Sequence, residues 1–166
     1  MKIAYNPRWH ENALYEQKMR APHMLTKFKN TPARQAGQIR GLIIEHHVSG
    51  WFKENFPRFY EEPDNYRQWT KICAHDFKLN LPSGKIYIDV SGPRKDGSLG
   101  SYSHKPKNGV DYHILAVPEG FKAWDDVDYT KGIKIVGVVK AQDYKPVIEK
   151  DKIINFEQWL KQMGLM

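Results

Sequence analysis

The chain has 166 residues, of which 40% are hydrophobic and 27% are charged, a composition typical of a folded globular protein rather than a disordered one. Its 26 Lys and Arg outnumber its 19 Asp and Glu, and the net charge of +7 favours a polyanionic partner, most often nucleic acid, although solubility alone would also account for it. The single cysteine, Cys73, excludes an intramolecular disulfide and a multi-cysteine zinc site, and its neighbours predict a small buried hydrophobe.

No apolar stretch of signal-peptide length opens the sequence, and no apolar run of about 18 residues occurs in it. We therefore expect one cytoplasmic domain over residues 1–166, with no membrane partner. Residues 1–30 are basic and interrupted by prolines, with a short helix within 10–20. They are either an arm that contacts a phosphate backbone or a packed cover for a core formed by residues 31–166.

The strongest helix signal covers residues 31–53. Thr31 can act as the N-cap, with Pro32 at the first helical position. Apolar residues then recur at helical spacing, namely Ala36, Ile39, Leu42, Ile43, Val48, Trp51 and Phe52.

Glu45 lies at the edge of this apolar stripe. Gly41, one turn earlier, removes a side chain where a strand could come close. We expect Glu45 to face a packed neighbour, either as a functional acid or as a boundary residue. In the second case its partner would be Arg40, His46 or His47.

Residues 54–70 predict an irregular connection, and Cys73 to Gly92 predict an antiparallel hairpin, since apolar and polar residues alternate on both sides of Pro82-Ser83-Gly84. The register that keeps the apolar residues on one face pairs Leu81 with Gly84, Leu79 with Ile86 and Phe77 with Ile88.

The same register places Asp76 across from Asp89 on the other face, with Cβ atoms roughly 5 Å apart. Like charges at this spacing are destabilising unless something offsets them. A bridging divalent cation or a shared proton would do so, and the alternative is a pair of solvated acids at the sheet margin.

Residues 92–109 form a long loop rich in Gly, Ser, Pro and Lys, and loops of this length are usually functional or disordered. Its cations, as candidates for holding phosphates, are Arg94, Lys95, Lys105 and Lys107. The apolar run 110–117 predicts a central strand, residues 133–141 a further strand, and residues 152–165 a helix capped by Asn155.

A helix glutamate, Glu45, followed by Asp76 and Asp89 on a hairpin, resembles the PD-(D/E)XK nuclease superfamily. The resemblance covers roughly residues 36–117 and includes HDF, KIYIDVSG and DYHILAV, which look like the small phage and bacterial branches. It implies an α/β single domain with a central mixed sheet of four to five strands and helices on both faces. It also implies a nuclease of a bacterial or phage-infected cell that hydrolyses phosphodiester bonds with Mg²⁺, for which Mn²⁺ can substitute. We expect DNA rather than RNA as the substrate, and both an endonuclease and an exonuclease fit the motif.

In that family Asp76, Asp89, the Val90 carbonyl and Glu45 would bind the metal. The chain departs from the motif at Ser91, where the family places a lysine that activates the attacking water and stabilises negative charge. Lys78, on the same face as Asp76 and opposite Tyr87, could replace it. Lys95 and Lys105 in the basic loop are the other candidates.

Three other functions compete with a nuclease. A non-catalytic nucleic-acid-binding protein of the same fold would use the basic loop without the acids. A histidine-based metal nuclease would need His46 with His47, or His104 with His113, yet adjacent helix histidines point about 100° apart and chelate poorly. A protein-binding inhibitor has no positive signal.

Overall fold

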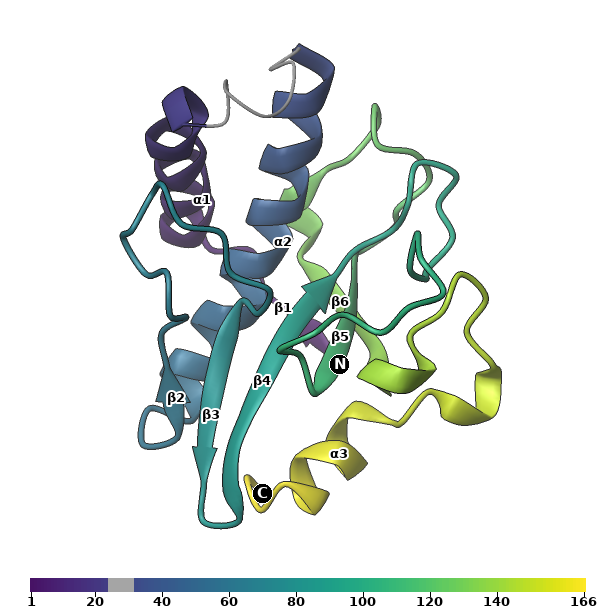
Figure 1. Cartoon of the computed structure of the whole chain (residues 1–166). Helices are drawn as coiled ribbons and strands as arrows, with labels where there is room; N and C mark the ends of the chain where they lie inside the picture. Colours follow the sequence, from purple (N-terminus) through teal and green to yellow (C-terminus); the bar gives the residue numbers. More distant parts are fainter. Residues whose placement is uncertain (24–31) are drawn as a thin grey trace.

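A computed structural model describes residues 1–23 and 32–166 (Figure 1). The expected N-cap Thr31 and residues 24–30 of the basic N-terminal segment lie outside the described residues. The described helices are α1 (Pro7–Arg20), α2 (Pro32–Asn55) and α3 (Phe156–Gln162). The described strands are β1 (Lys2–Ile3), β2 (Tyr60–Glu61), β3 (Phe77–Leu81), β4 (Gly84–Ser91), β5 (Tyr112–Pro118) and β6 (Ile133–Lys140).

The strands form one mixed sheet in the order β1-β6-β5-β4-β3-β2. It has six strands, where the sequence predicted four to five. The additional strands, β1 and β2, have two residues each and pair at the two edges, and so short an element carries no readable period. The α/β class and the mixed sheet are as predicted.

From Phe77 to Leu81 the hairpin of β3 and β4 has the predicted register, but the predicted pair of Asp76 with Asp89 is not part of the ladder. Phe77 pairs with Ile88, Leu79 with Ile86 and Leu81 with Gly84. Beyond Phe77 the ladder becomes irregular, because the backbone N–H of Asp76 donates to the carbonyl of Ile88 at 2.7 Å. The acid at the start of β3 is thus attached to β4 by its main chain.

The third long strand, β5, lies between β4 and β6, as its apolar run predicted. It is parallel to β4 and antiparallel to β6. One hydrophobic cluster includes residues of the sheet and of two helices, among them Ile44, Val48, Phe52, Phe77, Ile88, Ile114, Phe156 and Trp159. Because α2 and α3 contribute to the same cluster, the described contacts do not bear out a helical cover on both faces.

Irregular chain covers the opposite face of β4 and β5. The ring of Tyr144 stacks on buried His113 of β5, with ring centroids 3.9 Å apart, and its hydroxyl donates to the carbonyl of Gly100. Arg94 donates to the hydroxyl of Ser98 and to two backbone carbonyls, at 2.9 to 3.0 Å. The loop after β4 is therefore folded onto the segment that follows β6.

The N-terminal segment packs as a cover where it is described. Asn6 caps α1, and its backbone N–H donates to Nε2 of His47 in α2 at 3.1 Å. The indole of Trp9 fills the space over Gly50, where a Cβ atom would lie 2.5 Å from the ring. Figure 1 shows α1 and α2 side by side.

The glycine that brings elements together in α2 is Gly50 rather than Gly41. The prediction for Gly41 was wrong, because the residue is exposed and an added Cβ would meet no heavy atom within 4 Å. At the C-terminus, Asn155 caps α3 as predicted, and its side-chain oxygen accepts the N–H of Gln158 at 3.1 Å. The helix is shorter than the predicted 152–165.

Among the described helices, none combines the length and the apolar character needed to span a bilayer.

Candidate active site

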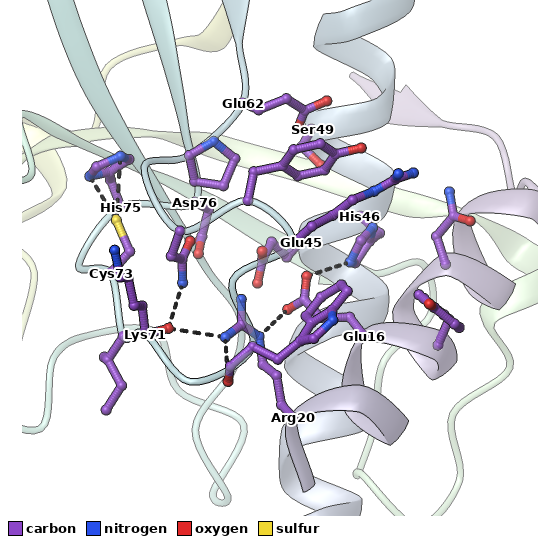
Figure 2. Close-up of a pocket in the computed structure, with 18 of the residues that line it drawn as sticks. Glu16, Arg20, Glu45, His46, Ser49, Glu62, Lys71, Cys73, His75 and Asp76 are labelled. Atoms are coloured by element: carbon purple, nitrogen blue, oxygen red, sulfur yellow. Dashed lines mark hydrogen bonds and ion pairs between the residues drawn. The ribbon is translucent and has the colours of Figure 1, made fainter. Parts of the chain in front are cut away.

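A cleft of about 590 Å³ lies between α1, α2 and the irregular segment 60–76 (Figure 2). Aromatic side chains form much of its wall, including Trp9, Tyr15, Tyr60, Tyr66 and Trp69. Charged and polar groups line the rest, including Glu16, Arg20, Glu45, His46, Cys73, His75 and Asp76. Two of the three predicted acids, Glu45 and Asp76, therefore share one cavity although 31 positions separate them in the sequence.

Glu45 extends from α2 into a cluster of ionisable groups that includes Glu16 of α1. One oxygen of Glu16 is 3.3 Å from Nε2 of His46, and the other accepts from Nε of Arg20 at 3.2 Å. The ligand atoms of Glu16, Glu45 and His46 all lie within 4.8 Å of one another. Figure 2 shows Glu45 between this cluster and Asp76.

Asp76 immediately precedes β3. One of its oxygens accepts the backbone N–H of Val90 at 2.7 Å. A main-chain donor on β4 thus fixes the carboxylate, and the other oxygen has no contact recorded among the described residues. The neighbouring Val90 was predicted to offer its carbonyl to a metal, and the recorded contact uses its N–H instead.

Asp89 on β4 is 8% exposed and has partners on both oxygens. Nδ1 of His113 donates to Oδ2 at 3.0 Å, and the hydroxyl of Ser91 reaches the same oxygen at 3.2 Å. Nζ of Lys107 donates to Oδ1 at 3.0 Å. The interpretation of Asp89 as a solvated acid is therefore wrong.

The pKa values of the acids diverge. Burial, followed by the charge of Asp76, raises the pKa of Glu45 well above its usual range. Burial and the charge of Asp89 do the same to the pKa of Asp76, against the hydrogen bond from Val90. Burial also opposes the charge of Asp89, but the hydrogen bond from His113 and the charge of Lys107 outweigh it, so the pKa of Asp89 is lowered.

The site thus combines one carboxylate of lowered pKa, Asp89, with two acids of raised pKa that have too little positive charge around them. A divalent cation bound by oxygen atoms would supply that charge. The donor set of Glu45 and Asp76, with Glu16 at its side, consists of the hard oxygen ligands that Mg²⁺ prefers. The residues therefore fit the predicted ion, although the trio Glu45, Asp76 and Asp89 is not among the described groups with all ligand atoms within 4.8 Å.

The lysines that could replace the one missing at position 91 lie in different parts of the structure. Lys78 pairs with Tyr87 as expected, but its Nζ lies 2.6 Å from Oδ1 of Asp64 and 3.8 Å from Glu61, on the flank of the cleft. Lys95 and Lys105 are exposed in the loop. Lys107, which the sequence suggested only as a phosphate ligand, is the loop lysine whose side chain contacts Asp89.

Two other predicted residues have structural contacts. Ser91 is 7% exposed and holds Asp89 and His113, with its oxygen 3.1 Å from Nδ1 of the histidine. Arg94 is occupied by the loop contacts described above.

Neither of the two histidine pairs weighed for a metal nuclease is brought together among the described residues, and His46 lies with Glu16 and Glu45 instead. Both ring nitrogens of His47 are used by backbone, since Nδ1 lies 2.7 Å from the carbonyl of Ile43 and Nε2 accepts from Asn6. His113 is held by Asp89, whereas His104 is exposed in the loop.

Sequence reasoning missed Glu16 and the role of Lys107. Glu16 lies in a polar helix without a clear apolar face, and contacts such as Trp9 on Gly50 and Asn6 on His47 bring that helix to α2. Lys107 lies 18 positions after Asp89 in a loop without a period. The sequence pointed to a second lysine only through Ser91, which stands where the family motif has a lysine.

The chain was compared with protein-family models, curated proteins and solved structures, and none of them matches it.

Proposed function

We propose that this protein is a metal-dependent nuclease that hydrolyses phosphodiester bonds in DNA. The observation that carries the proposal is the contact between Lys107 and Asp89, beside Glu45 and Asp76. It supplies a lysine–carboxylate pair in a chain whose motif has lost the lysine at Ser91. The basic balance of +7 and the exposed Lys95 and Lys105 are consistent with a polyanionic substrate.

Glu45 and Asp76 would hold Mg²⁺, with Asp89 completing the acidic set. When bound, the ion supplies a water of lowered pKa and charge for the phosphate oxygens. The chain's own contribution is to orient the ligands. The N–H of Val90 fixes one oxygen of Asp76, and His113 and Ser91 fix Asp89 in its ionised form.

Lys107 would act on the substrate rather than on the protein. Its ammonium group is half-exposed and lies on an acid of the site, where an incoming phosphate could accept a hydrogen bond from it. A cation at that position stabilises the negative charge that develops on the phosphate during hydrolysis. The lowered pKa of Asp89 and the raised pKa of Lys107 keep both members of the pair charged.

The test is cleavage of circular plasmid and of linear single-stranded and duplex DNA with Mg²⁺ or Mn²⁺. We expect Lys107→Met to lower the cleavage rate about 10²- to 10⁴-fold, and Glu45→Gln and Asp76→Asn to lower it at least as much. The matched control is Lys105→Met in the same loop, which removes an exposed cation and should raise KM with little effect on kcat. Asp125→Asn, at an exposed position, controls for the loss of one acidic side chain and should leave the cleavage rate unchanged.

Wild-type rates in Lys107→Met together with Asp76→Asn would refute the proposal. DNA binding that weakens with salt, without cleavage under either metal, would support a non-catalytic DNA-binding protein instead.

A further inference from the structure

A second set of metal-ligating side chains borders the cleft, on the irregular segment between β2 and β3. Ligand atoms of Asp64, Cys73 and His75 all lie within 4.8 Å of one another. His75 is 6% exposed, and its ring packs edge-on against Tyr87 with centroids 4.9 Å apart. Figure 2 shows Cys73 and His75 in contact beside Asp76. The proposed nuclease mechanism uses none of these three side chains.

The distances in this set suit a metal ion. Sγ of Cys73 lies 3.4 Å from Nε2 of His75, and Oδ2 of Asp64 lies 3.7 Å from the same nitrogen. With Zn–S of about 2.3 Å and Zn–N and Zn–O of about 2.0 Å, a tetrahedral zinc ion needs S···N of about 3.6 Å and N···O of about 3.3 Å. These two distances lie within about half an ångström of the values for bound zinc, and the third, between Sγ of Cys73 and the carboxylate of Asp64, is below 4.8 Å.

A thiol–imidazole hydrogen bond is the competing explanation, and it accounts for less of the geometry. Sγ of Cys73 lies 3.2 Å from Nδ1 and 3.4 Å from Nε2 of His75, so it is not aligned with either nitrogen as a hydrogen bond requires. Nε2 also accepts the backbone N–H of Asp64 at 3.4 Å, a long hydrogen bond that a metal ion at this nitrogen would replace. A thiol–imidazole hydrogen bond involves no acid, whereas a cation would bind the sulfur, Nε2 and the carboxylate of Asp64 together.

The surrounding charges favour a divalent ion. A thiolate and a carboxylate together balance a charge of +2, and the imidazole of His75 adds a neutral nitrogen ligand when the metal is bound. Nζ of Lys78 binds Oδ1 of Asp64 at 2.6 Å and leaves Oδ2 turned to the histidine. Side chains that bind a metal are commonly oriented in this way by a hydrogen bond from a neighbouring group.

We infer that Cys73, His75 and Asp64 bind a zinc ion, with the fourth position open to water. One soft sulfur, one nitrogen and one oxygen ligand favour zinc over Mg²⁺. The ion would link the two ends of the segment 64–75, which contains no regular strand or helix. It would thereby stabilise the part of the cleft wall that leads to Asp76. The inference does not depend on nuclease activity.

The test uses the full chain, stripped of metal with a chelator and titrated with Co²⁺ and then Zn²⁺. We expect one equivalent of Co²⁺ to produce tetrahedral visible bands and a near-ultraviolet thiolate-to-cobalt charge-transfer band, both of which Zn²⁺ removes. Cys73→Ser should abolish the charge-transfer band. His75→Ala should abolish binding, and Lys78→Met should weaken it about tenfold.

Two variants serve as controls. His104→Ala removes an exposed histidine, and Glu45→Gln removes an acid of the proposed Mg²⁺ site, and both should keep the cobalt spectrum. Alkylation of Cys73 in the wild-type chain should slow at least tenfold when Zn²⁺ is added, a measurement that needs no variant.

A wild-type chain that shows neither the charge-transfer band nor protection from alkylation would overturn the inference. Such a result would leave the nuclease proposal standing, because that proposal is tested by Mg²⁺-dependent cleavage.

Discussion

Asp76→Asn should make the metal-free protein more stable while it removes cleavage. The side-chain oxygen of Asn can still accept the N–H of Val90, so the fixed geometry at the start of β3 is kept. What disappears is a largely buried negative charge that faces Asp89 and Glu45. A residue that is kept for metal binding at the expense of stability behaves in this way.

The size of the effect follows from two opposing contributions. A neutral acceptor in place of a charged one weakens the hydrogen bond from Val90 by about 1 kcal/mol. Two like charges roughly 5 to 8 Å apart, the range for neighbouring acids, repel by about 2–3 kcal/mol at an effective dielectric constant of about 20, and the cation of Lys107 offsets part of this. The net gain is on the order of 1–2 kcal/mol, which raises Tm by roughly 2–8 °C in a chain of this length.

The gain in stability from Asp76→Asn should decrease as the pH falls. The pKa of Asp76 is raised in the folded state, so its charge destabilises the fold above that pKa, and the penalty disappears as pH falls toward the unfolded value of about 3.9. The difference in Tm between Asp76→Asn and wild type should therefore be largest at about pH 8 and shrink toward about pH 4.

Thermal melts in chelator, followed by circular dichroism across this pH range, measure the difference. Mg²⁺ at about ten times its Kd should stabilise the wild type by about 1.4 kcal/mol and Asp76→Asn by much less. Asp125→Asn, an exposed acid, should stay within about 0.5 kcal/mol of wild type. If Asp76→Asn instead melts below wild type at about pH 8 without metal, the carboxylate is already satisfied and the reasoning fails.

Two further substitutions test how the site is held. Gly50→Ala should destabilise the fold by about 1–3 kcal/mol in urea unfolding, because the new methyl group overlaps the indole of Trp9, whereas Gly41→Ala should be neutral or slightly stabilising. Ser91→Lys restores the residue of the motif but should lose about 3 kcal/mol or more and fail to rescue cleavage in a Lys107→Met background, because position 91 is buried against His113. A rescued double variant would show that the site can accept the lysine at either place.

The parts of this structure that the sequence predicted are those with a local period. Alternation on both sides of Pro82-Ser83-Gly84 determined the hairpin register, and a helical stripe placed Glu45 at the boundary of the core. Both patterns arise because one face of each element is buried, so a shift of one residue would expose apolar side chains.

The remaining features depend on segments without a period. Lys78 projects from β3 as predicted, but its partner Asp64 comes from a stretch of turns that no pattern places. The two-residue edge strands β1 and β2 are too short to show an alternation that would predict them. Glu16 reaches the site because α1 packs on α2, through the indole of Trp9 over Gly50 and the contact of Asn6 with His47, and no sequence period predicts these contacts.

In the proposed nuclease, the position of Lys107 accounts for the absence of a lysine at position 91. Oδ2 of Asp89 is already taken by His113 and Ser91, and a lysine at position 91 would displace that pair. Oδ1 remains, and it faces the loop that follows β4. A cation can reach it only if the loop is folded, and the contacts of Arg94 and Tyr144 fold it. The loss of one motif residue thus makes the proposed activity depend on loop order, a dependence that a lysine fixed on the strand would not have.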